Sequence, residues 1–306
     1  MNTWDIAIKT DQEENNMSIV YKTKEITPEG LVRVYEALGV SLEGNIAIKI
    51  STGEPGGHNF LQPGLIKDLV NRLSGTIVEC NTAYPGRRNT TQAHWETIRD
   101  HGFLAIAPCD ILDEEGDMAI PVESGFHLQE NYVGTHLKNY DSMVMLSHFK
   151  GHAMGGFGGA LKNMSIGLAS SRGKIWIHTS GTSNVFEDAF TADHDSFLES
   201  MVDADRSVMD FMGREKIVYI NVANRLSVDC DCDAHPHDPE MADIGIFASA
   251  DPVAVDQASV DAVYGSEDAG KRALIERMES RHGIHTVEAA QAHGLGNRKY
   301  ELVCID

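Results

Sequence analysis

The chain has 306 residues, and its 46 Asp and Glu against 25 Lys and Arg give a formal net charge of −21 at pH 7. A surface that negative repels phosphate backbones and anionic lipid, so we expect neither nucleic acid nor a membrane as the main partner. Hydrophobic residues make up 42% of the chain, enough for a large core. No stretch of about 18 apolar residues is present, which argues against a membrane-spanning helix.

The N-terminal segment MNTWDIAIKTDQEENN lacks a basic stretch followed by an apolar run, so it does not predict a signal peptide. We expect this segment to be weakly ordered. The five cysteines are an odd number in a long chain and do not describe a disulfide framework. Reduced thiols and a cytoplasmic location are therefore expected.

The first half of the chain alternates helix-like and strand-like segments. Thr-Pro-Glu at residues 27–29 is a good helix start, because a capping threonine precedes a first-turn proline. Short β-branched runs that end in polar residues are typical of buried strands. In chain order we predict a helix at 27–38, a strand at 45–50, a helix at 62–73, a strand at 76–79, a helix at 90–101 and a strand at 142–146.

The second half continues this pattern after an acidic stretch. Residues 182–212 are rich in Asp, Glu, Phe and Met, and we interpret them as an inserted helical pair. Strands are predicted at 216–220 and 244–248, and a helix at 251–263 begins with a capping Asp-Pro. The order predicts an α/β fold with a largely parallel or mixed central sheet flanked by helices. We treat residues 1–306 as a single domain, and a division into two lobes stays open.

The segment from Ser147 to Met164, SHFKGHAMGGFGGALKNM, follows a predicted strand and carries the densest polar chemistry. Glycines let the backbone approach a ligand, and lysines supply positive charge. The spacing matches neither a Walker A loop nor a dinucleotide fingerprint. We predict that Lys150, Lys162 and His152 are catalytic and that Asn163 binds ligand. The alternative is a flexible glycine loop with solvated lysines.

A second segment, DCDCDAHPHD at residues 229–238, gathers thiols, imidazoles and carboxylates within ten residues. Thiolate and imidazole favour zinc or iron over harder ions. The predicted metal ligands are His148, His152, Cys230, Cys232 and His235. The histidines at 148 and 152 would share a face only on a helix, which the glycines make uncertain. The alternative is an acidic turn with incidental cysteines.

A third segment, ECNTAYPGRRNTTQAH, places polar groups after the strand at 76–79. Paired arginines suit a carboxylate or a phosphate, so we predict that Asn81, Arg87 and Arg88 bind the ligand. Surface arginines that bridge acidic neighbours are an equal alternative. In the loop STGEPGGHNF, Glu54 and His58 could act as a general acid/base pair, and a capped turn without catalytic role is an equal alternative.

Four blocks of the sequence resemble a known family, domain of unknown function 362. They are SHFKGHAMGGFGGALKNMSIGLASSRGK, the upstream NTAYPGRRNTTQAHWETIRDHGF, the downstream DCDCDAHPHDPEMADIGIFASADPVAVDQASVDAV and the final GLGNRKYELV. The resemblance implies kinship with proteins many of which are described as iron–sulfur proteins carrying an inserted ferredoxin module. This chain has no cysteine between His178 and Lys216, so no ferredoxin-type cluster is expected. The family attaches no role to the matching positions.

Together these features predict a metal-associated enzyme that acts on a small anionic metabolite by isomerase or redox-linked chemistry, with zinc or iron as the metal. The alternative is a non-catalytic metal- or ligand-binding protein of an iron–sulfur or redox pathway. A homodimer is expected only because such dimers are common. All of this depends on the 147–164 and 229–238 segments lining a common cleft.

Overall fold

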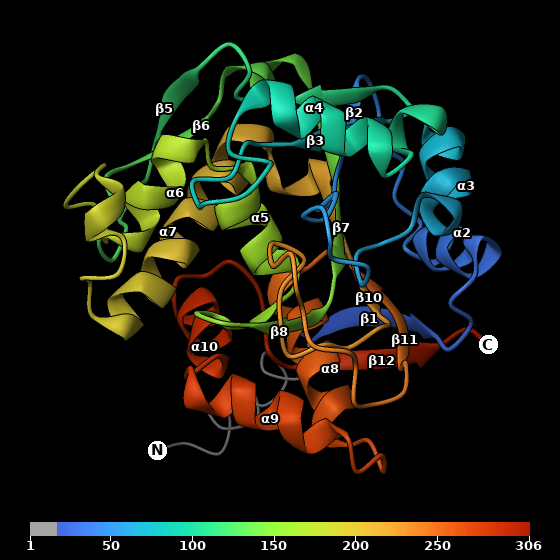
Figure 1. Cartoon of the computed structure of the whole chain (residues 1–306). Helices are drawn as coiled ribbons and strands as arrows, with labels where there is room; N and C mark the ends of the chain where they lie inside the picture. The colour runs from blue at the N-terminus through green and yellow to red at the C-terminus, as the bar shows by residue number, and fades with distance from the viewer. Residues whose placement is uncertain (1–16) are drawn as a thin grey trace, which may run out of the picture.

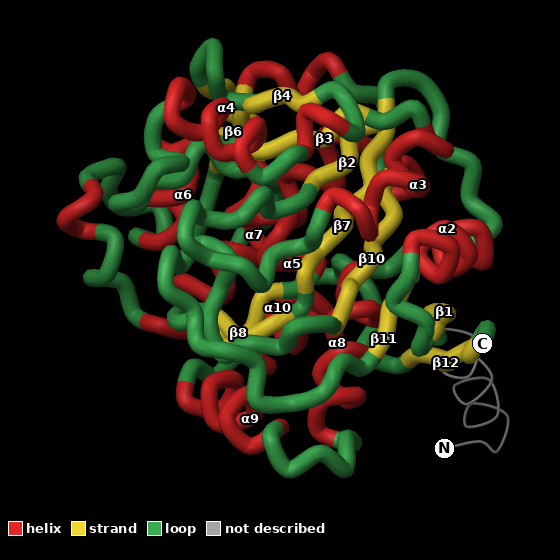
Figure 2. The backbone as a smooth tube through the Cα atoms, turned by 45° about the vertical axis from the view of Figure 1, so that its right-hand side comes forward, coloured by secondary structure: helices red, strands yellow, loops and turns green. Residues whose placement is uncertain are grey.

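The computed structural model describes residues 17–306, so the N-terminal segment predicted to be weakly ordered lies outside the described residues. Its centre is an eight-stranded sheet in the order β12-β1-β11-β10-β7-β2-β3-β4 (Figures 1 and 2). The strands are β1 (Ser18–Thr23), β2 (Ile46–Lys49), β3 (Thr76–Glu79), β4 (Cys109–Ile111), β7 (Ser142–His148), β10 (Ile217–Ala223), β11 (Gly245–Ser249) and β12 (Tyr300–Cys304). Among these, β11 alone runs antiparallel to both neighbours. The predicted mixed α/β fold is confirmed.

The helices cover both faces of the sheet, as the alternation of side chains along the strands requires. Val144 and Leu146 of β7 pack toward α2 (Pro28–Ala37), α3 (Pro63–Leu73) and α4 (Thr91–Asp100). Met143 and Met145 pack toward α5 (Ala160–Leu168), α7 (His194–Met212) and α8 (Pro252–Tyr264). Each face therefore has its own hydrophobic core.

The predicted helix starts are present with their caps. Thr27 accepts a hydrogen bond from the Gly30 N–H at 3.0 Å, and Pro28 opens α2. Asp251 accepts from the N–H groups of Val253 and Ala254 at 2.8 and 3.0 Å at the start of α8. These bonds satisfy first-turn N–H groups that have no partner inside the helix, which explains why the caps were good predictors.

The strand order reverses beside β2, and this reversal decides where a ligand can sit. From β2 the chain moves to β3 and then to β4 on one side, through α3 and α4. The next strand of the sheet, β7, returns to the other side of β2, and β10 lies beyond it. In open α/β sheets such a switch leaves a crevice beyond the carboxyl ends of the two strands that diverge.

Residues 182–212 are helical as predicted, but they form one long helix rather than a helical pair. The segment contains a short 3₁₀ turn at Phe186–Asp188 and one 19-residue helix, α7. Its residues Phe197, Met201, Ala204 and Val208 recur at helical spacing and are buried, and α7 packs against α5 and α10 (Ile284–Ala292). The segment is a core element rather than a peripheral addition.

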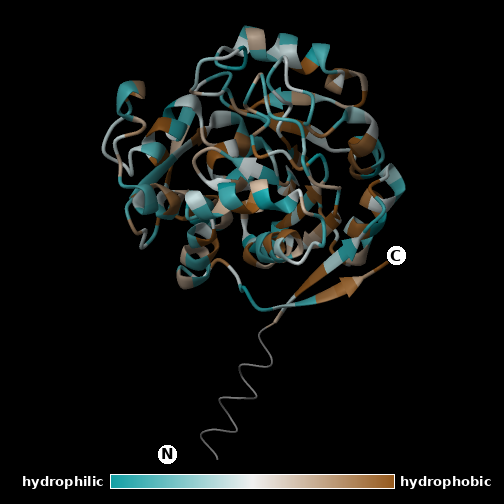
Figure 3. Cartoon of the chain, turned by 60° about the horizontal axis from the view of Figure 1, so that its bottom comes forward, coloured by the Kyte–Doolittle hydropathy of each residue, from teal (hydrophilic) through white to brown (hydrophobic). Residues whose placement is uncertain are grey.

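Several short elements had no clear sequence signal. They are β5 (Asp117–Pro121), β6 (Glu130–Gly134), β8 (Lys150–His152), β9 (Gly156–Gly158), α6 (Ser171–His178), α9 (Lys271–Ser280) and α10. The edge pair β1 and β12 was missed as well. Figure 3 shows hydrophobic colouring on this pair, where Ile19 and Leu302 are 45% and 43% exposed. Among residues 17–306, no helix is both long and apolar enough to cross a bilayer.

Candidate functional site

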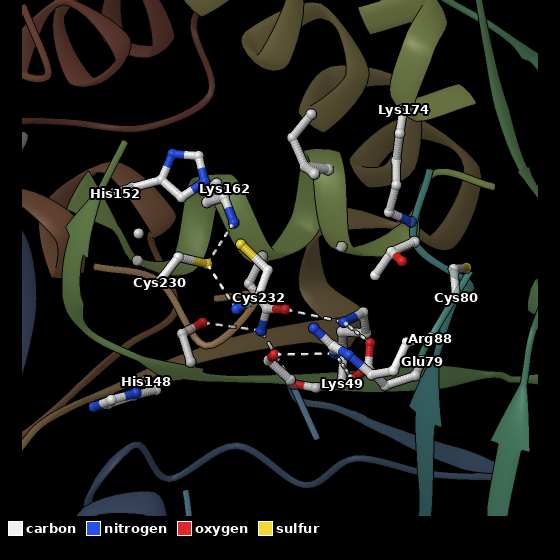
Figure 4. Close-up of a pocket in the computed structure, with 18 of the residues that line it drawn as sticks. Lys49, Glu79, Cys80, Arg88, His148, His152, Lys162, Lys174, Cys230 and Cys232 are labelled. Atoms are coloured by element: carbon white, nitrogen blue, oxygen red, sulfur yellow. Dashed lines mark hydrogen bonds and ion pairs between the residues drawn. The ribbon is translucent and has the colours of Figure 1, made fainter. Parts of the chain in front are cut away.

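A cavity of about 80 Å³ lies at the carboxyl ends of β2, β3 and β7, where the strand order reverses. Lys49 and Glu79 are the last residues of β2 and β3, and Ser147 lies near the end of β7. Figure 4 shows the side chains that converge there. The charged, imidazole and thiol groups that line it are Lys49, Glu79, Arg88, His148, Lys150, His152, Lys162, Lys174, His178, Cys80, Cys230 and Cys232.

The glycine-rich segment and the Cys/His segment lie against each other. Residues 150–158 form the β8–β9 hairpin, in which Lys150 pairs with Gly158. The Gly151 N–H donates to the Ser227 carbonyl at 2.8 Å, which ties the hairpin to the loop that carries the thiols. A Cβ at Gly151 would lie 2.3 Å from the Val228 carbonyl oxygen, so only glycine allows this approach.

Glu79 anchors two cations in the floor of the cavity. Its carboxylate lies 3.0 Å from Arg88 and 3.7 Å from Lys49, and it also accepts from Thr52. Burial raises the pKa of Glu79, but Lys49 and Arg88 outweigh it and lower the value to about 2. Burial lowers the pKa of Lys49 to about 8, although Glu79 opposes the shift. A second carboxylate, Glu54, pairs with Arg88 at 3.1 Å.

Two other lysines face the cavity without such partners. Among residues 17–306, neither Lys162 nor Lys174 is ion-paired with a carboxylate. The Lys162 ammonium lies 3.6 Å from the Cys230 sulfur, and the Lys174 ammonium donates to the Ala169 carbonyl at 2.5 Å. Burial lowers the pKa of Lys174. Figure 4 shows the two lysines on opposite sides of the cavity. A bound anion would favour the charged form of Lys174.

Lys150 differs from these two because a carboxylate balances its charge. Its ammonium lies 2.9 Å from Asp231 and donates to the His148 carbonyl at 2.9 Å. Burial lowers its pKa, but Asp231 together with Cys230 and Cys232 outweighs burial, so the pKa of Lys150 is raised. A lysine held in this way keeps its charge and fixes the Cys230–Cys232 loop to the hairpin.

His152, Cys230 and Cys232 place their potential metal-ligand atoms within 4.8 Å of one another. Cys230 is buried and Cys232 is exposed. The hydrogen bond from Cys232 holds the pKa of Cys230 well below its usual range, burial opposes the shift, and Lys162 and His152 add to it. The same bond raises the pKa of Cys232. The pair therefore favours one thiolate, at Cys230.

The two thiols suit a thiophilic metal such as zinc or iron, but the imidazole fits less well. Nδ1 of His152 accepts from the Gly155 N–H at 2.8 Å and from the Met154 N–H at 3.3 Å. A neutral imidazole that accepts at Nδ1 carries its proton on Nε2. That nitrogen is then a donor toward the Cys230 thiolate, and ligation of a metal by His152 would first require the turn at Gly155 to change.

Two of the predicted metal ligands do not belong to this group. Both ring nitrogens of His148 are engaged, Nδ1 with Asp231 at 2.9 Å and Nε2 with the Asn224 carbonyl at 2.7 Å. His148 therefore braces the Cys230–Cys232 loop, and neither of its ring nitrogens is free to face a metal. His235 is exposed and lies outside both the cavity and the thiol group. The three histidines predicted as metal ligands therefore lie apart. His148 ends β7, His152 ends β8, and His235 lies in an exposed turn.

The predicted ligand-binding residues divide in two. Arg88 and Asn163 line the cavity, and Asn163 accepts from Lys49 at 3.2 Å while donating to Ser147. Asn81 does not reach it, because its side chain donates to Thr91 and meets His94. Arg87 pairs with Glu96 at the surface, with half of its side chain exposed.

Sequence reasoning missed Lys49, Glu79, Lys174, His178 and Tyr84 as site residues. A lysine inside the apolar run NIAIKI was a usable signal, since a buried strand tolerates such a charge only with a partner. Lys174 and His178 are four residues apart on α6 and so share a face. The Tyr84 hydroxyl is hydrogen bonded to His178, whose pKa burial lowers to about 3.

Comparison with solved structures gives distant similarities. One is the lactate racemase apoprotein from Thermoanaerobacterium thermosaccharolyticum, with 13% identity and a TM-score of 0.47 over 82% of this chain. Another is a protein from Thermotoga maritima, with 12% identity and a TM-score of 0.40 over 83% of this chain. The chain spans 58% of the length of each. Similarities at this level say nothing of activity.

Among curated proteins, none matches the sequence. A family profile described as Domain of unknown function (DUF362) matches residues 46–261, which is more than half of the chain and includes every strand that borders the cavity. The chain belongs to the DUF362 family.

Proposed function

We propose that the protein is an enzyme that binds a small anionic metabolite in the cavity and acts on it at the Cys230–Cys232 end. The observation that carries the proposal is a cavity of about 80 Å³ that brings two lysines without carboxylate partners, the buried Lys174 and the half-buried Lys162, together with the buried thiol of Cys230. Charged groups are rarely buried without partners, and they cluster where a ligand supplies the missing charge.

The anion would be held between Lys162 and Lys174, which lie on opposite sides of the cavity. Arg88 and Asn163 also line it. Buried ammonium groups attract a carboxylate or phosphate more strongly than exposed ones, because less water screens them. The cavity volume of about 80 Å³ limits the ligand to a few non-hydrogen atoms, since one water needs about 10–15 Å³ of such volume.

Cys230 and Cys232 are the residues that would hold a metal, with zinc or iron favoured by the thiol donors. Such a metal supplies a Lewis acid that polarises a substrate oxygen. Lys162, 3.6 Å from the Cys230 sulfur, stands where it could move a proton to or from a ligand bound beside the thiols. Lys150 and His148 hold the loop in place through Asp231. The chemistry that fits is proton transfer next to a carboxylate, an isomerase-type reaction, with a redox-linked reaction as the other possibility.

A second candidate is covalent catalysis by Cys230 without a metal. The hydrogen bonds accepted by His152 Nδ1 favour it, because they leave Nε2–H as a donor to the Cys230 thiolate. A thiolate beside an imidazole and a lysine is a typical activated nucleophile. A non-catalytic metal-binding role in an iron–sulfur or redox pathway is a third outcome that the same experiment separates.

Metal analysis of protein purified without oxygen tests the proposal. We expect the thiols of the wild type to hold about one zinc or iron per chain, the usual load of a single thiolate site, and expect Cys230→Ser and Cys232→Ser to lose that ion. Cys304→Ser removes an exposed thiol remote from the cavity and should keep the metal.

If the wild type binds no metal after reconstitution, the metal-assisted enzyme is excluded. Alkylation with iodoacetamide at pH 7 then decides the second candidate, which predicts that Cys230 reacts faster than Cys304. Equal reactivity would exclude that candidate too. A metal-loaded protein that turns over no small carboxylate or phosphate would favour the non-catalytic role.

A further inference from the structure

We propose a second divalent-metal site, formed by Asp195, His282 and His285 with Glu199 as a fourth donor. These four residues are called the corner cluster. The inference does not rest on the proposed function, because the cluster shares no residue with the cavity. It lies where the start of α7 meets the turn between α9 and α10.

The donor atoms are already close. The potential ligand atoms of Asp195, His282 and His285 lie within 4.8 Å of one another. Nδ1 of His282 is 2.8 Å from Asp195, and Nε2 of His285 is 3.0 Å from Glu199. A metal ion would replace the protons that now join each imidazole to its carboxylate. The side chains are between 22% and 51% exposed, so an ion can reach them.

The backbone presents these donors on adjoining surfaces. Asp195 and Glu199 are four residues apart on α7 and so share one face. His282 and His285 belong to a single turn, with ring centroids 4.9 Å apart and planes inclined by 20°. His282 has φ +48°, a left-handed conformation that glycine adopts with less strain. The chain therefore places an imidazole where the end of α9 would favour glycine.

The donor set points to a class of metal. Two imidazoles with two carboxylates suit zinc, cobalt or nickel, whereas magnesium and calcium prefer oxygen donors alone. His127 adds an outer contact, because its Nε2 lies 2.6 Å from the second oxygen of Glu199 and orients that carboxylate. The surface pair His58–Asp238, at 3.1 Å, has the same kind of contact but belongs to no such group. It is a matched control.

The corner cluster also adjoins the hairpin of the cavity. A Cβ added at Gly156 in β9 would lie 2.8 Å from Gly283 Cα, so the turn between the two histidines touches the hairpin. That hairpin carries His152 and Lys150. A metal that joins α7 to the 282–285 turn would therefore brace the hairpin from behind.

Zinc binding in a Cys230→Ser/Cys232→Ser background tests the site, because that background removes the thiol site. Equilibrium dialysis against Zn²⁺ should show about one ion per chain, as expected for one set of four donors. Adding Asp195→Asn or His282→Ala/His285→Ala should weaken binding by at least roughly 10-fold, the cost of disturbing even an outer-shell partner. Adding His58→Ala should leave binding unchanged. Amide exchange in residues 150–158 should slow with Zn²⁺ only when the corner cluster is intact.

Equal zinc affinity in the corner variants and the His58→Ala control would overturn the proposal. So would absence of zinc binding in the thiol-free background, provided that circular dichroism shows the protein folded. If that background does not fold, the wild type serves: the His282→Ala/His285→Ala change should remove one zinc and leave the thiol-bound metal. A wild type that binds zinc at the corner cluster but holds no metal at the thiols would count against the proposed function and leave the corner site standing.

Discussion

Buried carboxyl groups outside the cavity show how strongly a single residue can depend on its surroundings. Asp205 on α7 is buried, and neither of its carboxyl oxygens has a hydrogen-bond partner among the described residues. Burial, together with Asp256, holds the pKa of Asp205 well above its usual range. Asp256 accepts from the Ala160 and Leu161 N–H groups, and burial raises its pKa to about 6. Asp205 therefore holds its proton to a higher pH in the folded chain than an exposed carboxyl does.

This linkage predicts that Asp205→Asn changes the pH dependence of stability. The folded carboxyl keeps its proton while the unfolded one releases it near pH 4, so the wild type loses stability as pH rises above about 4. The asparagine variant lacks this loss. We expect it to be more stable than the wild type at pH 8 by about 1–3 kcal/mol, with the gap closing toward pH 4.

Urea unfolding at several pH values between 4 and 8 measures the difference. Asp238→Asn alters an exposed carboxyl and should follow the wild type at each pH. A constant difference between Asp205→Asn and the wild type across the range would contradict the assignment, because an uncoupled packing change has no pH dependence.

At the scale of elements, the β8–β9 hairpin is the piece that makes the cavity. Gly151 lets the hairpin lie against residues 227–228, and Gly159 leaves room for Asp256 at the start of α5, where a Cβ would be 2.3 Å from its carboxylate. A methyl group at Gly151 meets backbone, which cannot rotate away as a side chain can. The hairpin and the thiol loop can therefore lie in close contact only because residue 151 has no side chain.

Gly151→Ala should separate these two elements. We expect the free energy of unfolding to fall by roughly 1–3 kcal/mol, the usual cost of overpacking a tight contact. Gly64→Ala, where no atom lies within 4 Å of the added Cβ, should be neutral or stabilising because it sits in α3. Chemical denaturation of the two variants measures both effects, and a Gly151→Ala chain as stable as Gly64→Ala would show that the contact is not tight.

Elements with strong local signals were predictable from sequence. The run NIAIKI and the Thr-Pro and Asp-Pro caps marked β2, α2 and α8 to within one residue at each end, and KIVYI marked the start of β10 but not its last three residues. The hairpin at 150–158 was not predictable, because three-residue strands rich in glycine carry no period. The helix α7 was recognised as helical, but its acidic residues hid its burial. Asp203, one of them, is buried because it accepts from three backbone N–H groups, at residues 126–128.

At the scale of the whole molecule, the sequence predicted at which edge of the sheet the site lies, but only some of the residues that form it. The loops that follow β2, β3 and β7 meet because parallel strands end at one edge, and that followed from their order. Lys174 and His178 were invisible to that argument, since α6 reaches the cavity only through tertiary packing against β6 and α7. The contacts of His148 with Asp231 and Asn224 could not be predicted either, because no sequence pattern reveals that both its ring nitrogens have partners.

The charge distribution of the molecule is also uneven. A chain of net charge −21 buries Lys49, Lys150, Lys174 and Arg88 around one small cavity. An acidic exterior slows the approach of an anion, so the cavity must supply the attraction locally. We propose that a small anion binds in this cavity and not elsewhere on the surface.

Thermal unfolding with phosphate or malonate, at constant ionic strength, tests that claim most directly. A ligand that binds only the folded chain raises its melting temperature. We expect a rise for the wild type and for Lys138→Met, which changes an exposed lysine, and little or no rise for Lys162→Met or Lys174→Met. An equal rise in all four proteins would contradict it, because the anions would then act on the surface as a whole.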